Sequence, residues 1–190
     1  MTLLEGEARR NAQATIKACH YAHSVPSGKS YYIAHEEALV VWSLPANYMA
    51  RRHFLPGVED PRVFELTRLW APDGHDRNLL TQAIASAVAV LKRVEPDVDL
   101  VVSYADPSAG HSGFVYRAAS WIPAGRSEEV RAAPCADGTG PVLPRRAFHS
   151  GPTHINKSEI ETLGYVQLKL EGKYRFVRPL SRRAKRVWRQ

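Results

Sequence analysis

Residues 78–104 read NLLTQAIASAVAVLKRVEPDVDLVVSY, and this stretch decides the class of fold. Apolar residues recur at helical spacing in its first part: Leu80, Ile84, Ala87, Val88, Leu91 and Val94. This period predicts a long helix from Asn78 to Glu95, with Asp76 as its cap and Pro96 after its end. Residues 100–104 form a short continuous apolar run, which is typical of a strand buried on both faces of a sheet.

The flanking segments extend this alternation of helices and strands. On composition and periodicity we expect helices over 5–19 and 113–120, and strands over 31–34, 38–42, 63–70, 121–122 and within 164–177. Residues 35–37 fit a hairpin turn between two of these strands. The succession predicts one α/β domain over residues 1–180, with a central mixed sheet flanked by helices.

Two segments depart from this pattern. Residues 123–157 are rich in Pro and Gly, which predicts a long loop of the functional or disordered kind. Residues 181–190 are expected to form a basic C-terminal extension, in which residues 181–188 are compatible with a helix.

The composition is that of a soluble globular protein, with 44% hydrophobic and 24% charged residues in 190. No apolar run approaches the roughly 20 residues that span a bilayer, and the first residues lack the features of a signal peptide. The two cysteines, Cys19 and Cys135, make no disulfide framework. We therefore expect a cytoplasmic protein without a membrane partner.

The positive charge is concentrated in the C-terminal quarter. Residues 145–190 contain 12 of the 26 Lys and Arg residues and three of the 19 Asp and Glu residues, a net charge of +9 against −2 for the rest. From Lys173 to Gln190 no residue is acidic. Such a segment favours a polyanionic partner, and nucleic acid is the commonest. The predicted DNA contacts are Arg178, Arg182, Arg183, Lys185 and Arg186. The alternative is a solvated basic tail, but Tyr174, Phe176 and Trp188 lie among the cations and favour docking or stacking.

The densest group of reactive side chains follows the buried strand. In open α/β sheets, ligands bind at the carboxyl ends of strands. Asp106 comes directly after the strand, and His111 and Tyr116 follow on the next turn and helix. An acceptor, an imidazole and a phenol near one strand end form a workable set for general acid and base catalysis. Each also has a structural explanation: Asp106 before a proline as a turn former, His111 as a loop hydrogen-bond partner, and Tyr116 as a core aromatic.

This region resembles the Mom family of phage DNA-modification proteins, a divergent branch of the GNAT acyltransferase fold. The likeness covers roughly residues 17–127. It is carried by Cys19-His20-Tyr21, by residues 65–69 (Glu-Leu-Thr-Arg-Leu), by residues 103–106 (Ser-Tyr-Ala-Asp), by the Gly-His-x-Gly-x-x-Tyr pattern of residues 110–116, and by residues 119–127.

The resemblance implies an enzyme that adds a carbamoylmethyl (acetamido-type) group to N6 of adenine in double-stranded DNA, and so protects phage DNA from restriction in the host cytoplasm. By residue match, His20, Tyr21, Arg68, Asp106 and Tyr116 are expected to carry the site. Asp106 would bond the N6 hydrogens and take up a proton, and Tyr116 would protonate a leaving group. His20 and Tyr21 would orient the base, and Arg68 would hold an anionic donor or a phosphate.

Reaching N6 in a duplex requires extrusion of the base, which needs an aromatic surface to receive it. Tyr21, Tyr104 and Trp121 are candidates for this surface. Ser103, Tyr104 and His111, at and after the end of the buried strand, are also predicted to contact the substrate.

The group donor follows less directly from the sequence. GNAT enzymes hold the coenzyme A pyrophosphate on a Gly-rich turn before the long helix, but residues 71–78 here contain one Gly and two acids. A helix start with Arg77 and Asn78 remains, so acetyl-CoA and a glycyl group on an aminoacyl-tRNA both stay open as donors.

A metal is a weaker expectation. His20 and His23 lie three residues apart, and the resemblance points to iron if a metal is bound, but no complete ligand set is present. Two other functions stay open: an N-acyltransferase acting on a small amine or peptide, and a non-catalytic DNA-binding protein.

Overall fold

The computed structural model describes residues 1–45, 48–127, 131–132, 168–169 and 172–189. The chain divides into two compact units. The first contains residues 1–105, 113–125 and 175–190, and the second contains residues 106–112 and 126–174.

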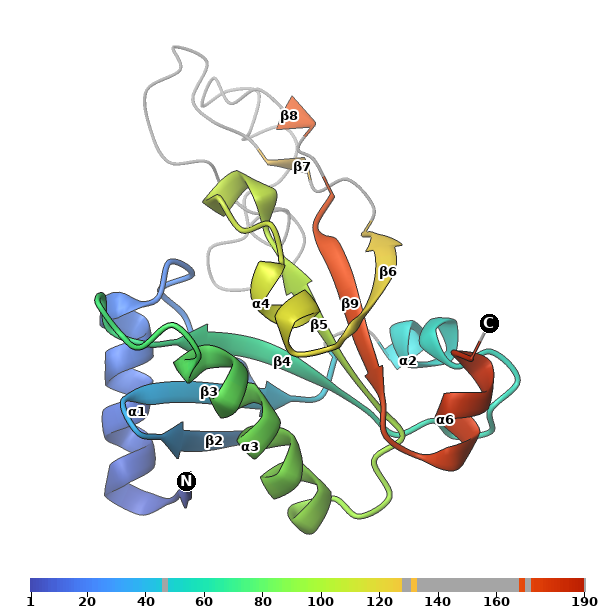
Figure 1. The fold of residues 1–190 in the computed structure, drawn as a ribbon, viewed down its shortest axis with the longest axis horizontal. Helices are drawn as coiled ribbons and strands as arrows, with labels where there is room; N and C mark the ends of the chain where they lie inside the picture. Colours follow the sequence, from blue (N-terminus) through green and yellow to red (C-terminus); the bar gives the residue numbers. More distant parts are fainter. Residues whose placement is uncertain (46–47, 128–130, 133–167, 170–171, 190) are drawn as a thin grey trace, which may run out of the picture. The chain divides into compact units, whose positions relative to one another are not determined.

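A seven-stranded mixed sheet forms the centre of the fold (Figure 1). Its strands follow the order β1 (Thr2–Leu4), β2 (Ser30–His35), β3 (Ala38–Ser43), β4 (Val63–Trp70), β5 (Leu100–Ala105), β9 (Tyr174–Pro179) and β6 (Ile122–Arg126). β1 to β4 pair antiparallel, whereas β4 and β5 pair parallel. The predicted α/β class with a mixed sheet is confirmed.

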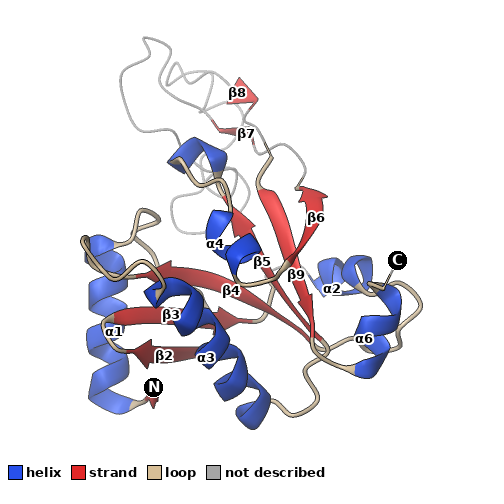
Figure 2. Ribbon diagram, in the orientation of Figure 1, coloured by secondary structure: helices blue, strands red, loops and turns tan. Residues whose placement is uncertain are grey.

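Helices flank this sheet (Figure 2). They are α1 (Gly6–Cys19), α2 (Tyr48–Phe54), α3 (Leu79–Val94), α4 (Phe114–Ala118) and α6 (Arg182–Val187). Val41 packs with α1, and the Trp42 indole N–H donates to the Ala87 carbonyl of α3 at 3.2 Å. Successive strand residues point to opposite faces, so α1 and α3 cover opposite faces of the sheet.

Most predicted elements agree with the structure to within a residue or two, and the exceptions have local causes. The expected cap of the long helix was wrong: Asn78 is the N-cap of α3, without a side-chain hydrogen bond. Asp76 instead accepts the Leu79 N–H through its backbone carbonyl at 3.0 Å, because the chain turns once before the helix begins. β1 and α2 were not predicted, since segments of three and seven residues are too short to show a period.

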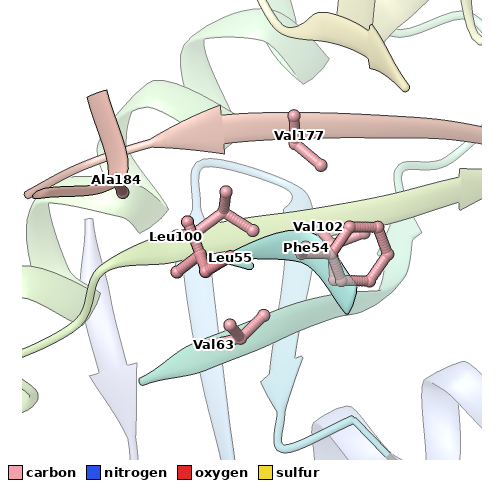
Figure 3. Packing of buried hydrophobic residues seen from close by; sticks show 7 residues of the cluster. All are labelled: Phe54, Leu55, Val63, Leu100, Val102, Val177 and Ala184. Carbon is pink, nitrogen blue, oxygen red and sulfur yellow. The ribbon is translucent and has the colours of Figure 1, made fainter. Parts of the chain in front are cut away.

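The hydrophobic core reaches the end of the chain. One buried cluster joins α2, β4, β5, β9 and α6 through Phe54, Leu55, Val63, Leu100, Val102, Val177 and Ala184 (Figure 3). Ala184 is fully buried in it. The helix expected over residues 181–188 is thus confirmed as α6, and it packs on the core of the first unit.

The β4–β5 pairing ends early. Only Val63–Leu66 pair with Leu100–Ser103, although β4 continues to Trp70. Beyond these pairs the two strands diverge (Figure 1). On its other side β4 pairs with β3, and the register of that pairing shifts between Val41 and Trp42. Ser103 therefore lies where the central pair of strands separates.

The second unit is described only in part. It contains the 3-10 helix η1 (Pro107–Ala109), β7 (Arg131–Ala132) and β8 (Leu168–Lys169). Most of the loop predicted over 123–157, and part of the strand region predicted over 164–177, lie outside the described residues. The beginning of that loop is a correction, because residues 123–126 continue the strand β6. None of the described helices combines the length and the apolar character needed to cross a bilayer.

Candidate functional site

Tyr116 is a buried tyrosine of the first unit. It lies on α4 with 7% of its surface exposed, and its ring centroid is 5.2 Å from that of Phe176 and 5.5 Å from that of Trp121. α4 begins after Gly113, which has φ +74°. A Cβ at Gly113 would come within 2.2 Å of the Phe176 ring. Glycine at this position thus allows the close approach that places Tyr116 beside Phe176.

The Tyr116 hydroxyl is held by Ser103. The two side chains are hydrogen-bonded, and Ser103 is fully buried and donates its hydroxyl proton to the Leu66 carbonyl at 2.9 Å. Ser103 is thus anchored to the backbone of β4 next to the phenol.

Burial raises the pKa of Tyr116 to about 12. The Ser103 hydrogen bond lowers the pKa in part, and the negative charges of Tyr21 and Glu65 in their ionised forms raise it. The phenol therefore keeps its proton at neutral pH and is suited to donate it rather than to act as a base.

Glu65 is the residue that sequence reasoning missed. It lies half-buried on β4, and its charge affects the pKa of both Tyr116 and Tyr104. Tyr104 has a pKa raised to about 12, mainly by burial and then by Glu65, while Arg175 lowers it. In the sequence, Glu65 is only one member of the matching segment 65–69. A carboxylate between Phe64 and Leu66, in the apolar first half of the strand, was the signal that could have singled it out.

His20 and Tyr21 follow α1 as predicted. His20 is 5% exposed, and its Nδ1 accepts the Ala22 N–H at 3.0 Å. Tyr21 is 48% exposed and stacks on His20, with 4.5 Å between ring centroids. The buried imidazole thus supports a half-exposed aromatic ring. Tyr21 also lies close enough to Tyr116 for its ionised form to raise the pKa of the Tyr116 phenol.

Arg68 connects β4 to the loop that follows Tyr21. Its Nε donates to the Ser24 carbonyl at 2.7 Å and its Nη2 to the Ser24 hydroxyl at 2.9 Å. Its Nη1 donates to the Thr67 carbonyl at 2.6 Å. The guanidinium therefore orders the loop next to His20 and Tyr21. Binding of an anionic donor by Arg68 stays a prediction.

Asp106 belongs to the second unit and is strongly engaged there. Its Oδ1 accepts from the Ser108 N–H at 3.0 Å and from the Ser108 hydroxyl at 2.6 Å, which caps η1. Its Oδ2 is 2.8 Å from Lys173 Nζ. Burial would raise the pKa of Asp106, but the bonds to Lys173 and Ser108 outweigh it and the pKa is lowered. Asp106 is therefore an ionised cap of η1. His111 is exposed, and its backbone N–H donates to the Asp106 carbonyl at 3.0 Å.

The remaining predicted residues are distributed over the first unit. Arg77 and Asn78 are exposed at the start of α3. His23 contacts the Lys17 carbonyl through Nδ1 at 3.1 Å, so it closes the end of α1. Within the described ranges no group of three or more His, Cys, Asp or Glu is arranged to hold a metal, and the iron site stays a prediction.

The predicted DNA contacts differ among themselves. Arg182, Lys185 and Arg186 are exposed on α6, and Arg178 is half-buried on β9. Arg183 is instead bound to the buried Asp99, with Nε–Oδ1 and Nη2–Oδ2 distances of 2.6 Å. Arg183 thus fastens α6 to the start of β5.

The fold and this residue pattern define an α/β protein with a buried tyrosine at the point where its central strands separate. The chain belongs to the Mom protein family, whose model matches residues 4–190, so the resemblance found in the sequence is confirmed. One relative is the methylcarbamoylase mom of Escherichia phage Mu, which is 31% identical over 80 residues. That match covers 42% of this chain and 33% of the relative.

Two solved structures are similar in fold. A Bacillus subtilis acetyltransferase in complex with CoA has 10% identity and a TM-score of 0.47, over 95% of this chain and 97% of that one. An agmatine N-acetyltransferase has 12% identity and a TM-score of 0.43, over 94% and 99% of the two chains.

Proposed function

We propose that this protein is a transferase that modifies adenine in double-stranded DNA at N6, adding a carbamoylmethyl group and so protecting phage DNA from restriction. Membership in the Mom family and the name of the phage Mu relative support the reaction class. The observation that carries the proposal is the Tyr116–Ser103 pair, a buried phenol with a pKa of about 12 at the end of the β4–β5 pairing.

Tyr116 is proposed as the general acid. When the adenine N6 nitrogen attacks the donor, the bond from the transferred carbon to its carrier breaks. The carrier leaves as an anion and needs a proton: a thiolate from acetyl-CoA, which gives an N6-acetyl adenine, or a ribose alkoxide from a glycyl-tRNA, which gives an N6-glycyl adenine. The N6-glycyl adenine is an isomer of the carbamoylmethyl product and reaches it by a rearrangement that neither adds nor removes atoms. A neutral phenol held by Ser103 supplies that proton. Arg77, Asn78 and Arg68 are the proposed contacts of the donor.

Asp106 is proposed to accept the N6 hydrogens and take up a proton. Its lowered pKa keeps it ionised and makes it a weak base, so hydrogen bonding to the amine is the larger part of this role. Tyr21, half-exposed and stacked on His20, is the proposed surface for the extruded base. Ser103, Tyr104 and His111 are the further proposed substrate contacts.

The experiment is mass spectrometry of nucleosides from plasmid DNA co-expressed with the protein. We expect a heavier adenine nucleoside with the wild type and a loss of at least about 100-fold with Tyr116→Phe, since general acids contribute about 10²–10⁴-fold. Tyr31→Phe is the matched control, because Tyr31 donates its hydroxyl to Glu95 and takes no part in the proposed site. Unmodified DNA from the wild type would overturn the proposal.

The product also identifies the donor. An acetyl group and a carbamoylmethyl group differ in composition, so the nucleoside mass separates them. A glycyl amide and a carbamoylmethyl amine share one composition and differ in which carbon is bonded to N6. Fragmentation of the modified base distinguishes these two, because only the glycyl amide releases a primary aminomethyl fragment.

A further inference from the structure

The outer face of α6 is entirely basic. Arg182, Lys185 and Arg186 are exposed and three or four residues apart, so they share one face of the helix. Arg189 follows directly and is also exposed. Ala184 lies on the opposite side, where it is fully buried in the core. The helix therefore presents its cations to solvent in a fixed orientation.

A second basic helix lies next to α6. The Trp188 indole N–H donates to the Phe54 carbonyl at 3.0 Å, and Phe54 shares the buried cluster with Ala184 (Figure 3). Phe54 ends α2, whose last turn contains Arg51, Arg52 and His53. Arg52 and His53 are exposed. Two segments 134 residues apart in the sequence thus combine their positive charges (Figure 1).

β9 adds a cation to the same place. Arg175 Nη1 donates to His53 Nε2 at 3.2 Å, and its guanidinium carbon lies 5.9 Å from the centre of the Phe54 ring. A planar guanidinium held by an imidazole and an aromatic ring loses little freedom on binding a phosphate. His53 is therefore a positioning residue for Arg175.

Arg183 marks the edge of this surface. Its guanidinium is committed to Asp99 and to the Glu59 carbonyl. The hollow beside Arg183 is lined by four acidic and four basic residues: Glu59, Asp60, Asp97, Asp99, Arg62, Lys92, Arg182 and Arg183. The charge is balanced on this side of α6, so the excess positive charge lies on the side that faces solvent and α2.

We propose that Arg52, Arg175, Arg182, Lys185, Arg186 and Arg189, the α2–α6 basic surface, form the docking surface for the phosphate backbone of duplex DNA. The inference rests on the proposed function, in which duplex DNA is the substrate. Clustered exposed cations supply sequence-independent affinity and fix the orientation of a duplex. α2 is the part of this surface that charge counting along the C-terminal segment does not reveal.

The test measures binding of a fluorescent DNA duplex to the full chain between about 50 and 200 mM salt. One variant is Arg52→Gln on α2, and the other combines Arg182→Gln, Lys185→Gln and Arg186→Gln on α6. Each lost phosphate contact should reduce the slope of log K against log salt by about 0.9. We expect a reduction of about one contact for the first variant and two to three for the second. The control is Arg10→Gln, an exposed cation on α1, which should leave the slope unchanged.

An unchanged slope in both variants would overturn the proposal. So would a loss of binding to a tRNA competitor with DNA binding intact, which would assign the surface to RNA. The outcome is independent of catalysis: a reduced slope supports the surface even where no adenine product forms, and only the missing product then counts against the proposed function. Equal melting temperatures of all variants establish that the fold is retained, because the exchanged side chains are exposed.

Discussion

Gly113 and Gly110 have nearly the same backbone conformation, with φ +74° and +76°, but different surroundings. A Cβ at Gly110 would meet no atom within 4 Å, whereas one at Gly113 would overlap the Phe176 ring. Two constraints thus favour glycine at position 113 in the turn before α4: its left-handed backbone conformation and its close packing against Phe176. The position of Tyr116 depends on the second constraint, the close packing of Gly113 against Phe176.

We therefore expect Gly113→Ala to destabilise the fold by about 2–5 kcal/mol, the sum of a left-handed alanine and a forced shift in a packed core. Gly110→Ala should cost only about 1–2 kcal/mol, the conformational part. Urea unfolding of both variants measures the difference. Equal losses would show that Phe176 moves away at little cost.

The raised pKa of Tyr116 makes the stability depend on alkaline pH. Below pH 10 the phenol is protonated in both the folded and the unfolded chain. Between pH 10 and about 12 the unfolded chain loses this proton and the folded chain keeps it, so the free energy of unfolding falls. The expected decrease is on the order of 1 kcal/mol per pH unit.

Tyr116→Phe should remove this contribution, and Tyr104→Phe should act in the same way because its pKa is also raised to about 12. The measurement is urea unfolding of the three proteins between pH 8 and pH 11 (about the range in which tyrosine titrates). Identical pH slopes for the wild type and Tyr116→Phe would show that the phenol is solvated.

At the scale of elements, Asp99 joins three parts of the fold. It is 1% exposed and accepts the Arg62 N–H at 2.9 Å before β4, the Ser181 hydroxyl at 2.7 Å and the Arg183 guanidinium. Burial would raise the pKa of Asp99, but the bonds to Arg183, Ser181 and the Arg62 N–H lower it. Through these hydrogen bonds the buried Asp99 carboxylate holds the start of α6 next to the start of β5.

We expect Asp99→Asn to destabilise the protein by about 2–4 kcal/mol at neutral pH, since it leaves the Arg183 guanidinium without its anion. The folded pKa is below the unfolded one, so the stabilisation is present above about pH 4 and is lost as the pH falls further. Urea unfolding between neutral pH and about pH 3 is the measurement. Asp97→Asn, an exposed neighbour, should change stability little; an equal loss there would contradict the buried-pair account.

For the whole molecule, the C-terminal segment has two separable functions. Its exposed cations carry charge, while Ala184, Trp188 and the Asp99–Arg183 pair belong to the packing of the first unit. We therefore expect substitution of the exposed cations to change the charge without loss of stability, and removal of the buried residues to reduce stability.

Deletion of residues 181–190 should lower the melting temperature strongly or prevent folding, because it opens the core at Ala184 and removes the Ser181 and Arg183 donors of the buried Asp99. Exchange of Arg182, Lys185 and Arg186 for Gln should leave the melting temperature nearly unchanged. Circular dichroism during heating compares the two proteins. A stable, folded deletion variant would show that the segment is a dispensable tail.

The amino-acid sequence by itself determined the periodic parts of this protein. The helical repeat of residues 78–95, the alternation of residues 63–70 and the apolar run of residues 100–104 each formed the expected element, because burial pattern and backbone preference are local properties. The turn-forming role of Asp106 before a proline was predictable for the same reason. The short matching motifs also sufficed to indicate the Mom family.

Only the tertiary structure decided which side chains are partners. Nothing near Arg183 in the sequence indicates Asp99, and nothing near Tyr116 indicates Ser103 or Glu65. The pairing of α2 with α6 is equally invisible along the chain. These contacts form between segments brought together by burial of apolar surface, so the partner of a charged or polar group depends on the whole packing arrangement rather than on its neighbours in sequence.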